Sequence, residues 1–398
     1  MEPGNSTGID HVRELPRTRQ DQVRNRVAIS AVFFLNGFGL ASWFIHIPSV
    51  KGQLGLNEQQ LGLALLGTGL GSLGTMWLSG WLMGRFGSRR VLTVATLGFA
   101  LSLVFPVWAP NFLLLTASLA FLGGCNGLMD VCMNNQAAHF EALAGRPVMS
   151  SFHAIWSLGG WCGSLLGSLF LLNQQLATWH LVFLCLVIIG WMVRLTPSLL
   201  RTASEHGPVF ALPSREIAIF ALLCLIAMLS EGSVADWAGV HLRDDLGTPY
   251  ALSGLGFNAF SICMAGGRFV GDRVVLWIGR EWTVTAGALM GASGLFVAAL
   301  ASTPVLSIVG FGLAGLGMSN IVPVLFSLAA LRIPGAIERA TSSVFATGYL
   351  GFLIGPPLVG MFAQRFTLPV ALAGVAVLVT GICIFSPKRD RQAVSGKQ

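Results

Sequence analysis

The sequence predicts an all-α membrane protein whose twelve transmembrane helices form two pseudo-symmetric six-helix bundles. The chain has 398 residues, of which 54% are hydrophobic and 10% are charged, and its mean hydropathy is +0.72. Soluble domains carry about 25% charged residues, so this composition excludes a soluble globular enzyme and a disordered chain. The apolar runs are continuous and do not alternate with polar residues, which favours helices over membrane-spanning strands.

Six runs in the first half have the length of about 20 apolar residues that crosses a bilayer. Arg26 precedes the first run, and Gly84 and Arg85 end the second. Arg90 precedes the third run, and Pro110 separates the third from the fourth. Stretches with polar residues separate the fifth and the sixth runs from each other and from their neighbours. The predicted helices are 27–47, 60–83, 91–108, 111–137, 150–172 and 178–197.

The second half contains six further runs after the longest internal break, 198–215, which we interpret as a cytoplasmic linker. It separates a bundle at 27–197 from a bundle at 216–386. The polar ends at 1–26 and 387–398 are predicted cytoplasmic tails, and the first has no apolar core typical of a cleaved signal peptide. The predicted helices are 216–240, 252–276, 282–300, 304–330, 341–364 and 368–386.

The basic residues predict how the helices are oriented. With the N-terminus inside, 21 of the 24 Lys and Arg residues fall on the cytoplasmic side, and only Lys51, Arg243 and Arg365 fall outside. This asymmetry follows the positive-inside rule and predicts a bacterial inner-membrane protein with both termini in the cytoplasm. It also explains the sequence pI of about 9.4 without a nucleic-acid partner. The seven cysteines lie inside apolar runs and predict neither a disulfide framework nor a metal site.

The second half repeats the first at an offset of 192–194 residues. The most informative matches pair Asn126 with Asn320, and Trp43 with Trp237. Because each half contains six helices, both halves have the same topology. The sequence therefore predicts a parallel repeat about an axis along the membrane normal, with a central site between two bundles that rock against each other.

Several segments resemble the major facilitator superfamily. The segment 80–90, which reads GWLMGRFGSRR, is similar to the signature loop between its second and third helices, although Gly84 stands where an acidic residue is usual. The segments 41–48, 126–134, 151–160 and 317–323 resemble the fucose-permease-like branch of bacterial inner-membrane proteins. The resemblance implies secondary active transport and, in proton-coupled members, an acidic residue on the fourth helix.

Two carboxyl groups are predicted to bind the coupling proton. Asp130 lies in the fourth apolar run, with Asn126 and Asn134 one helical turn away on either side, so the three share a polar stripe. Glu231 lies near the middle of the seventh run. Ionisable residues within a bilayer are expensive, and a functional role is the default hypothesis for them. Asp236, nearer the outside, is interpreted as a partner of Arg243 or of solvent.

Polar and aromatic residues in the apolar runs are predicted to bind the substrate. His153 and Trp156 share a helix face, and a Trp ring is suited to stacking on a sugar. The alternative interpretation of each candidate is ordinary helix packing. The predicted substrate-binding residues are Asn36, Trp43, Asn126, Asn134, His153, Trp156, Asn320 and Tyr349.

Charged residues near the segments 84–90 and 267–280 are predicted to form inter-helix locks that gate the transporter, or to serve only as topology signals. These gating candidates are Arg85, Arg89, Arg90, Asp272 and Arg273. Gly159, Gly163 and Gly167 repeat every four residues and predict a close approach of another helix.

The sequence therefore predicts a secondary active transporter that moves a small polar solute, with a sugar as one candidate, by proton symport. The alternative is a proton-antiporting exporter of drug-like compounds or metabolites. The absence of a phosphate-binding GxxxxGK[ST] loop and of hydrolase motifs argues against ATP-driven transport and against an enzyme. We expect no cofactor apart from the proton, no metal, a small-molecule substrate and the lipid bilayer as partners, and a monomeric state.

Overall fold

The computed structural model describes residues 18–146, 148–201, 213–332 and 337–385, and in these ranges the chain contains helices and no strands. The first bundle contains α1 (Arg19–Phe44), α2 (Ile47–Leu54), α3 (Glu58–Phe86), α4 (Ser88–Ser102), α5 (Phe112–Ala144), α6 (Met149–Phe170) and α7 (Gln174–Leu195). The second contains α8 (Ala218–Val240), α9 (Tyr250–Ser253), α10 (Leu255–Ile278), α11 (Arg280–Leu300), α12 (Pro304–Met318), α13 (Ile321–Arg332), α14 (Ile337–Arg365) and α15 (Leu368–Phe385).

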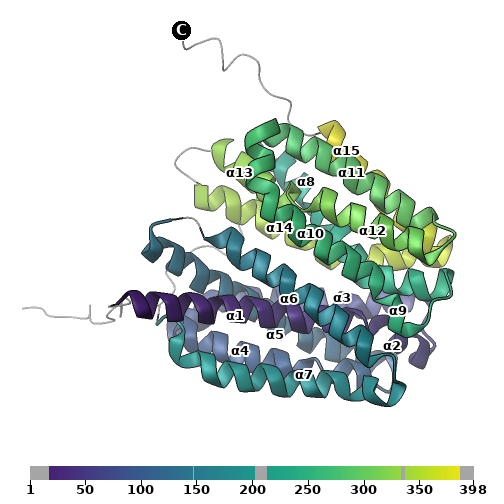
Figure 1. Ribbon diagram of the computed structural model, residues 1–398, viewed down its shortest axis with the longest axis horizontal. Helices are drawn as coiled ribbons and strands as arrows, with labels where there is room; N and C mark the ends of the chain where they lie inside the picture. The colour runs from purple at the N-terminus through teal and green to yellow at the C-terminus, as the bar shows by residue number, and fades with distance from the viewer. Residues whose placement is uncertain (1–17, 147, 202–212, 333–336, 386–398) are drawn as a thin grey trace, which may run out of the picture.

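The two bundles lie one above the other in Figure 1, with their long helices running in the same general direction. Each of the twelve predicted segments coincides with one long helix or with two short helices in succession. Nine helical segments within the described ranges are long and apolar enough to cross a membrane. The predicted all-α fold with twelve spans in two bundles is confirmed. Between the bundles, α6 packs on α10 and α3 packs on α14.

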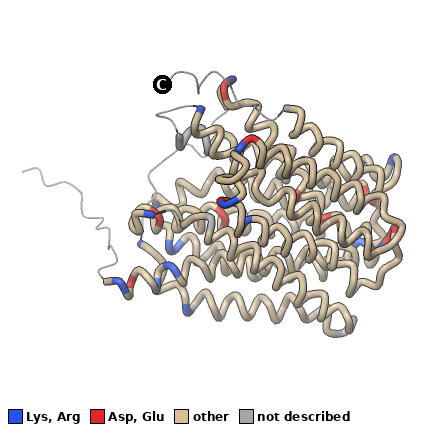
Figure 2. Tube along the Cα trace, turned by 45° about the horizontal axis from the view of Figure 1, so that its top comes forward, with Lys and Arg blue, Asp and Glu red and all other residues tan. Residues whose placement is uncertain are grey.

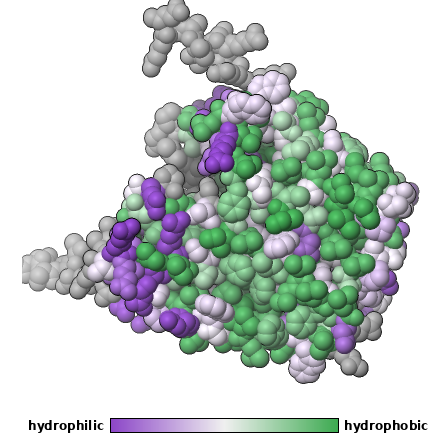
Figure 3. All heavy atoms as spheres, viewed as in Figure 1, coloured by the Kyte–Doolittle hydropathy of each residue, from purple (hydrophilic) through white to green (hydrophobic). Residues whose placement is uncertain are grey.

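The molecule has two polar ends and an apolar body. Lys and Arg gather toward one end (Figure 2). We call it the terminal end, because the described part of the chain begins and ends there, at Thr18 and Phe385. The opposite end is formed by α2 and α9, and we call it the α2/α9 end (Figure 1). Between the ends the visible surface is mostly hydrophobic (Figure 3). Large apolar side chains in the middle of helices, such as Trp77 on α3 and Leu289 on α11, are exposed, as expected for a surface that faces lipid.

The first helix begins eight residues earlier than predicted, at Arg19. Thr18 caps it, because its hydroxyl accepts from the Asp21 backbone N–H at 3.1 Å while the Asp21 carboxylate accepts from the Thr18 backbone N–H at 3.1 Å. Such a capping box satisfies two backbone donors at the helix start. Residues 19–26 therefore belong to α1, and the predicted tail at 1–26 is too long.

The predicted linker at 198–215 begins as a packed segment. Gln136 on α5 exchanges two hydrogen bonds of 2.8 Å with the backbone of Leu200, which ties residues 198–201 to the first bundle. Residues 1–17, 202–212 and 386–398 lie outside the described ranges, as does the predicted C-terminal tail.

The first and the tenth of the helices that the sequence predicts as continuous are each broken into two. The first ends at Phe44 and resumes as α2 with Pro48 in its first turn. The tenth breaks at Ser319 and Asn320 between α12 and α13. Pro323 has no N–H to donate to the carbonyl four residues earlier, which is that of Ser319. The second break therefore leaves a backbone acceptor available to a side chain.

The predicted glycine stripe on α6 is confirmed as a packing surface. A methyl group at Gly159 would lie 2.2 Å from the carbonyl oxygen of Phe34, and one at Gly163 would lie 2.1 Å from that of Phe38. Side chains cannot be accommodated at these distances, so α6 and α1 meet backbone to backbone. This contact fixes how the first bundle presents the α1 and α6 side chains to its interior.

We expect Gly163→Ala to lower the free energy of unfolding by about 1–3 kcal/mol, because the added methyl group must push α1 and α6 apart. The measurement is thermal unfolding of the purified protein in detergent. Gly190→Ala on α7 is the matched control, because no atom lies within 4 Å of the added methyl group. Equal stability of the two variants would contradict the close α1–α6 contact.

Candidate functional site

Three predicted substrate-binding residues meet inside the first bundle. The amide nitrogen of Asn36 on α1 donates to Asn126 Oδ1 on α5 at 2.9 Å, and Trp156 Nε1 on α6 donates to Asn36 Oδ1 at 2.8 Å. Asn36 is 2% exposed and Asn126 is 8% exposed. Residues from three helices therefore form one hydrogen-bonded group, and Asn36 is the residue that joins the other two.

A second polar group joins the two bundles. Arg268 on α10 donates through Nη1 to the hydroxyl of Ser157 on α6 at 2.9 Å, and through Nε to the carbonyl of Ser319 at 3.3 Å. Its Nη2 lies 3.8 Å from Glu231 Oε2 on α8. The Ser319 carbonyl is the acceptor that Pro323 leaves without its helical donor. The break in the tenth span therefore helps to hold the guanidinium in place.

These two groups are linked through α6, because Trp156 and Ser157 are neighbours in the chain. We refer to the residues of both groups as the central polar chain. Its members are Asn126, Asn36, Trp156, Ser157, Arg268 and Glu231. It runs from α5 in the first bundle to α8 in the second, and it brings the predicted coupling residue Glu231 to predicted substrate-binding residues.

Asp130 lies one helical turn from Asn126 on α5, as the stripe predicts. Asn134 donates to Asp130 Oδ1 at 3.1 Å and to its backbone carbonyl at 2.9 Å. The predicted substrate-binding residue Tyr349 lies on α14 of the other bundle, where its ring packs on those of Phe345 and Phe352 with centroid distances of 5.6 and 5.8 Å. Within the described residues Asp130 forms no ion pair, so its charge has no basic partner. Such a carboxyl group is suited to binding a proton.

His153 lies on the same helix as Trp156, and its ring meets that of Phe33 edge to face with a centroid distance of 5.4 Å. It interacts electrostatically with Arg268. His153 therefore borders the central polar chain at Ser157, whose hydroxyl donates to the His153 carbonyl at 3.1 Å.

Trp43 and Asn320, which were also predicted to bind substrate, lie apart from the central polar chain. Trp43 is 2% exposed in the hydrophobic core. Asn320 donates to the Gly267 carbonyl at 2.9 Å and packs on Gly271, where a methyl group would lie 1.9 Å from its Oδ1 atom. The Asn320 side chain thus fastens the break between α12 and α13 to α10.

The predicted pairing of Asp236 with Arg243 is wrong. Arg243 donates to the Thr248 carbonyl at 2.8 Å and lies over the Tyr250 ring at 4.2 Å. In the described parts of the chain, Asp236 makes neither a hydrogen bond nor an ion pair. The π-helix at His241–Asp245 separates the two residues and turns Arg243 toward Tyr250.

For the predicted gating residues, the contacts seen among the described residues lie within one bundle. Arg89 donates to the Thr196 carbonyl at 2.6 Å and so ties α4 to the end of α7 within the first bundle. Arg85 lies over the rings of Trp81 and Phe86 on its own helix. The other three candidates are exposed, and no contact across the bundles is described for them. They are Arg90, Asp272 and Arg273.

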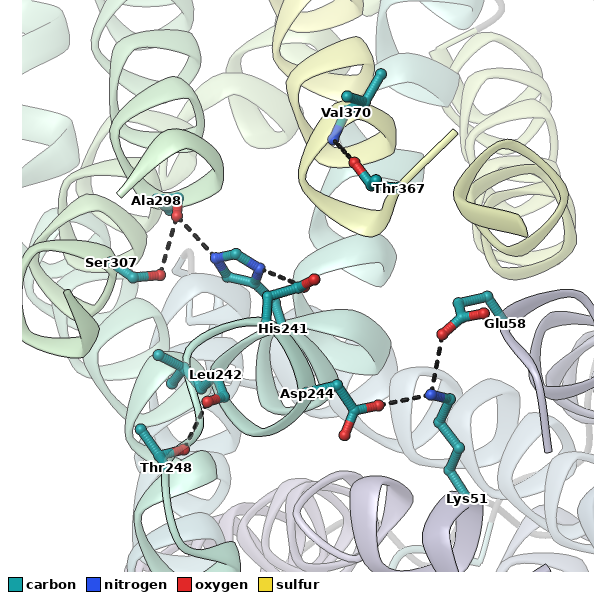
Figure 4. A network of polar contacts seen from close by, with 11 residues as sticks. Lys51, Glu58, His241, Leu242, Asp244, Thr248, Ala298, Ser307, Thr367 and Val370 are labelled. Atoms are coloured by element: carbon teal, nitrogen blue, oxygen red, sulfur yellow. Dashed lines mark hydrogen bonds and ion pairs between the residues drawn. The ribbon is translucent and has the colours of Figure 1, made fainter. Parts of the chain in front are cut away.

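The bundles are instead joined at the α2/α9 end. Lys51 on α2 pairs with Asp244 of the π-helix in the second bundle and, at 3.0 Å, with Glu58 at the start of α3 (Figure 4). Nearby, the Ser164 hydroxyl on α6 donates to Asn258 Oδ1 on α10 at 2.8 Å. These contacts hold the two bundles together from this end to the middle of the molecule.

Helices α3 and α14 also meet near this end, at a pair of glycines. A methyl group at Gly62 would lie 3.2 Å from the Cα atom of Gly360 and 2.6 Å from the Pro356 carbonyl oxygen. The two helices therefore touch through their backbones at this point.

We expect Lys51→Met to open the α2/α9 end, because the variant removes the ion pair between the bundles. The measurement is the rate at which a maleimide labels a cysteine introduced at Ile45, which is buried against Gly254 of the other bundle. If the variant lowers the free energy that favours the closed α2/α9 end by about 1 kcal/mol, labelling should be roughly fivefold faster. The control is Arg365→Met, since the interaction found for Arg365 within the described ranges is with its neighbour Phe366. Equal labelling rates in both variants would contradict the role of Lys51.

Sequence reasoning did not single out Arg268, Ser157 or Lys51. Arg268 was grouped with the loop arginines, whereas it lies in the middle of α10. A basic residue ten positions before the end of an apolar helix was the available signal. Ser157 follows His153 by one helical turn, and Lys51 is one of only three basic residues predicted outside. None of these patterns identifies the partner.

Comparison with known proteins agrees with this architecture. The sequence model of the Major Facilitator Superfamily matches residues 28–229 and 219–398. An uncharacterised MFS-type transporter of Yersinia pestis is 34% identical, over 90% of this chain and 94% of that protein. Membrane protein MosC of Rhizobium meliloti is 31% identical, over 90% of this chain and 89% of that protein.

Solved structures share the fold at lower identity. The nucleoside transporter NupG superimposes with a TM-score of 0.74 at 13% identity, covering 91% of this chain and all of that one. The E. coli fucose:proton symporter FucP gives 0.62 at 17%, covering 92% and 98%. A D-xylose–proton symporter gives 0.72 at 16%, with the same coverage. Together with the family match, the helical architecture shows that the chain is a membrane transporter of the major facilitator superfamily.

Proposed function

We propose that this transporter is a proton symporter for a small polar solute, with a sugar as one candidate, and that it works by alternating access. The observation that carries the proposal is the pair of carboxyl groups at the central polar chain. Asp130 lies one helical turn from Asn126, which begins the central polar chain in the first bundle, and Glu231 ends that chain in the second bundle. The polar side chains between Asn126 and Glu231 can bind hydroxyl groups.

The distribution of charge supports a cytoplasmic location of the terminal end in a bacterial inner membrane. The α2/α9 end is then periplasmic, and its contacts close the central polar chain from the outside. This arrangement fits a conformation in which the transporter faces the cytoplasm. Rocking of the bundles would break the contacts of Lys51 and Ser164 and expose the same residues to the periplasm.

Coupling follows from the energetics of burying a charge. An ionised Asp130 without a basic partner opposes closure of the site around it, whereas a protonated Asp130 does not. A solute that hydrogen-bonds to Asn36, Asn126 and Trp156 favours the same closed arrangement of the bundles. Proton and solute then stabilise one state together, which is the requirement for coupled movement. FucP and the D-xylose–proton symporter, which share the fold, are proton symporters by name.

The test uses de-energised cells that express the protein and receive pulses of sugars and small metabolites while the external pH is recorded. Transient alkalinisation with one compound is the expected result, since a symporter carries protons inward with its solute. Acidification would contradict symport and favour the proton-antiporting exporter of drug-like compounds or metabolites. Cells that carry the empty vector provide the baseline.

A further inference from the structure

Arg268 is only partly satisfied by its contacts. A guanidinium group has five N–H donors, and here Nε and one hydrogen of Nη1 are used by the Ser319 carbonyl and the Ser157 hydroxyl. The distance of 3.8 Å from Nη2 to Glu231 Oε2 is too long for a hydrogen bond. Within the described residues, three N–H groups of a side chain that is 17% exposed therefore have no hydrogen-bond acceptor.

Glu231 also has an unused hydrogen-bonding atom. Its Oε1 atom is buried and has no hydrogen-bond partner among the described residues. Buried polar groups are normally hydrogen-bonded, because an unpaired one retains its desolvation penalty. A loose ion pair with free donors on one side and a free acceptor on the other is unusual for a purely structural contact. It is the arrangement expected where one partner is exchanged.

The geometry points to Arg268 as the group that binds the carboxylate of an acidic solute, while a protonated Glu231 withdraws from it. This inference names the substrate class of the proposed symporter and rests on that proposal for the role of Glu231. Arginine binds carboxylates through two parallel N–H groups on neighbouring nitrogens. Arg268 has a free hydrogen on Nη1 and two on Nη2, so each terminal nitrogen has a donor available. One proton taken up by Glu231 allows one carboxylate to replace it, so the charge beside Arg268 is unchanged.

Charge also distinguishes a carboxylate from a phosphate. In the proposed exchange, one negative charge on the solute replaces the one negative charge of Glu231. Arg268 is the only basic member of the central polar chain. A phosphate dianion would leave one negative charge uncompensated in a buried site that already contains Asp130, which is unfavourable. Among the residues that the structure describes, His153 on α6 and Cys224 on α8 are the other titratable groups beside the pair.

The remainder of the central polar chain suits the body of such a solute. Ser157, which binds Arg268, is the chain neighbour of Trp156, and Trp156 is hydrogen-bonded to Asn36. Amide groups and an indole N–H near a carboxylate-binding guanidinium can bind the hydroxyl groups of a hydroxy acid or a sugar acid. The inferred substrate class is therefore a hydroxyl-bearing monocarboxylate.

The test measures thermal stabilisation of the purified full chain in detergent by lactate, gluconate and galacturonate. Matched neutral compounds are glucitol and galactose, and galactose 6-phosphate represents phosphates. At least one carboxylate is expected to stabilise the wild-type protein, and the neutral compounds and the phosphate are not. This comparison needs no variant and so does not depend on how any variant folds.

Variants then locate the site. Arg268→Lys should weaken the carboxylate response at least about tenfold, because Lys lacks the two-pronged donor geometry. Arg280→Gln, on the exposed start of α11, is the control and should respond as the wild type does. Binding of the carboxylate to the wild type should weaken as Glu231 loses its proton. Glu231→Gln should show a smaller difference between acidic and neutral pH, and the dependence that remains should come from Asp130.

Two results would overturn the inference: no carboxylate stabilises the wild type, or a stabilising carboxylate acts equally on Arg268→Lys. The proposed symport is tested separately. A neutral sugar that causes alkalinisation in cells would keep proton symport and remove the carboxylate site. A carboxylate that binds through Arg268 but moves no protons would keep the site and remove the coupling.

Discussion

Asp130→Asn is expected to abolish proton-driven accumulation while leaving solute exchange intact. The amide cannot take up a proton, but it keeps an oxygen that accepts the hydrogen bond from Asn134. A difference of one pH unit drives up to about tenfold accumulation when one proton accompanies each solute, since 1.4 kcal/mol corresponds to a factor of ten. In proteoliposomes with an acidic exterior, this ratio should fall to about one in the variant for a neutral solute, because such a solute does not displace Glu231 from Arg268.

Solute exchange supplies the control within the same preparation. Counterflow of labelled against unlabelled solute requires binding and rocking but no net proton movement, so it should continue in Asp130→Asn. Unchanged accumulation in this variant would remove Asp130 from the coupling mechanism. Loss of accumulation in Glu231→Gln alone would assign coupling to the second bundle.

Asn36→Ala is expected to weaken solute binding and to destabilise the first bundle together. The substitution leaves Asn126 Oδ1 without its 2.9 Å donor and Trp156 Nε1 without its 2.8 Å acceptor. Each buried polar group that loses its partner costs about 1–3 kcal/mol. We therefore expect a free energy of unfolding that is lower by roughly 2 kcal/mol or more, measured by thermal unfolding in detergent, and transport with at least about tenfold weaker apparent affinity.

The matched control is Asn25→Ala. Asn25 lies on the same helix, and its amide donates to the Ser198 carbonyl at 2.9 Å near the terminal end, away from the central polar chain. This variant should lose some stability but keep the apparent affinity of the wild type. A parallel loss of affinity in both variants would mean that Asn36 acts only through the stability of α1.

The helices were predictable because the physics of a bilayer acts on local sequence. An apolar run of sufficient length must form a helix to satisfy its backbone, so all twelve spans follow from the composition of continuous segments. The breaks before Ile47 and at Ser319 were missed, because each contains only one or two polar residues within a long apolar run, namely His46, and Ser319 with Asn320. Pro48 and Pro323 were visible signals, but a proline alone does not distinguish a kink from a break.

The members of the site were partly predictable, whereas their partners were not. A polar residue such as Asn36 in an apolar run indicates a buried contact wherever the helix packs. That its partners are Asn126 and Trp156 depends on the rotation of α1 against α5 and α6, which the glycines of α6 set through backbone contact. Arg268 was missed because its segment resembles a loop of the first half, although it forms part of α10.

The glycine contact between α3 and α14 has a mechanical consequence. Gly62 and Gly360 present bare backbone to each other, so no side chains interlock there that a tilt of the helices would have to pull apart. One bundle can therefore tilt against the other at this crossing without breaking side-chain contacts there. The energy barrier to the motion then comes mainly from a few polar contacts between the bundles, namely those of Lys51 with Asp244, Ser164 with Asn258, and Ser157 with Arg268. Substitutions in these polar contacts should accordingly change the rate of the transport cycle far more than substitutions in the surrounding apolar surface.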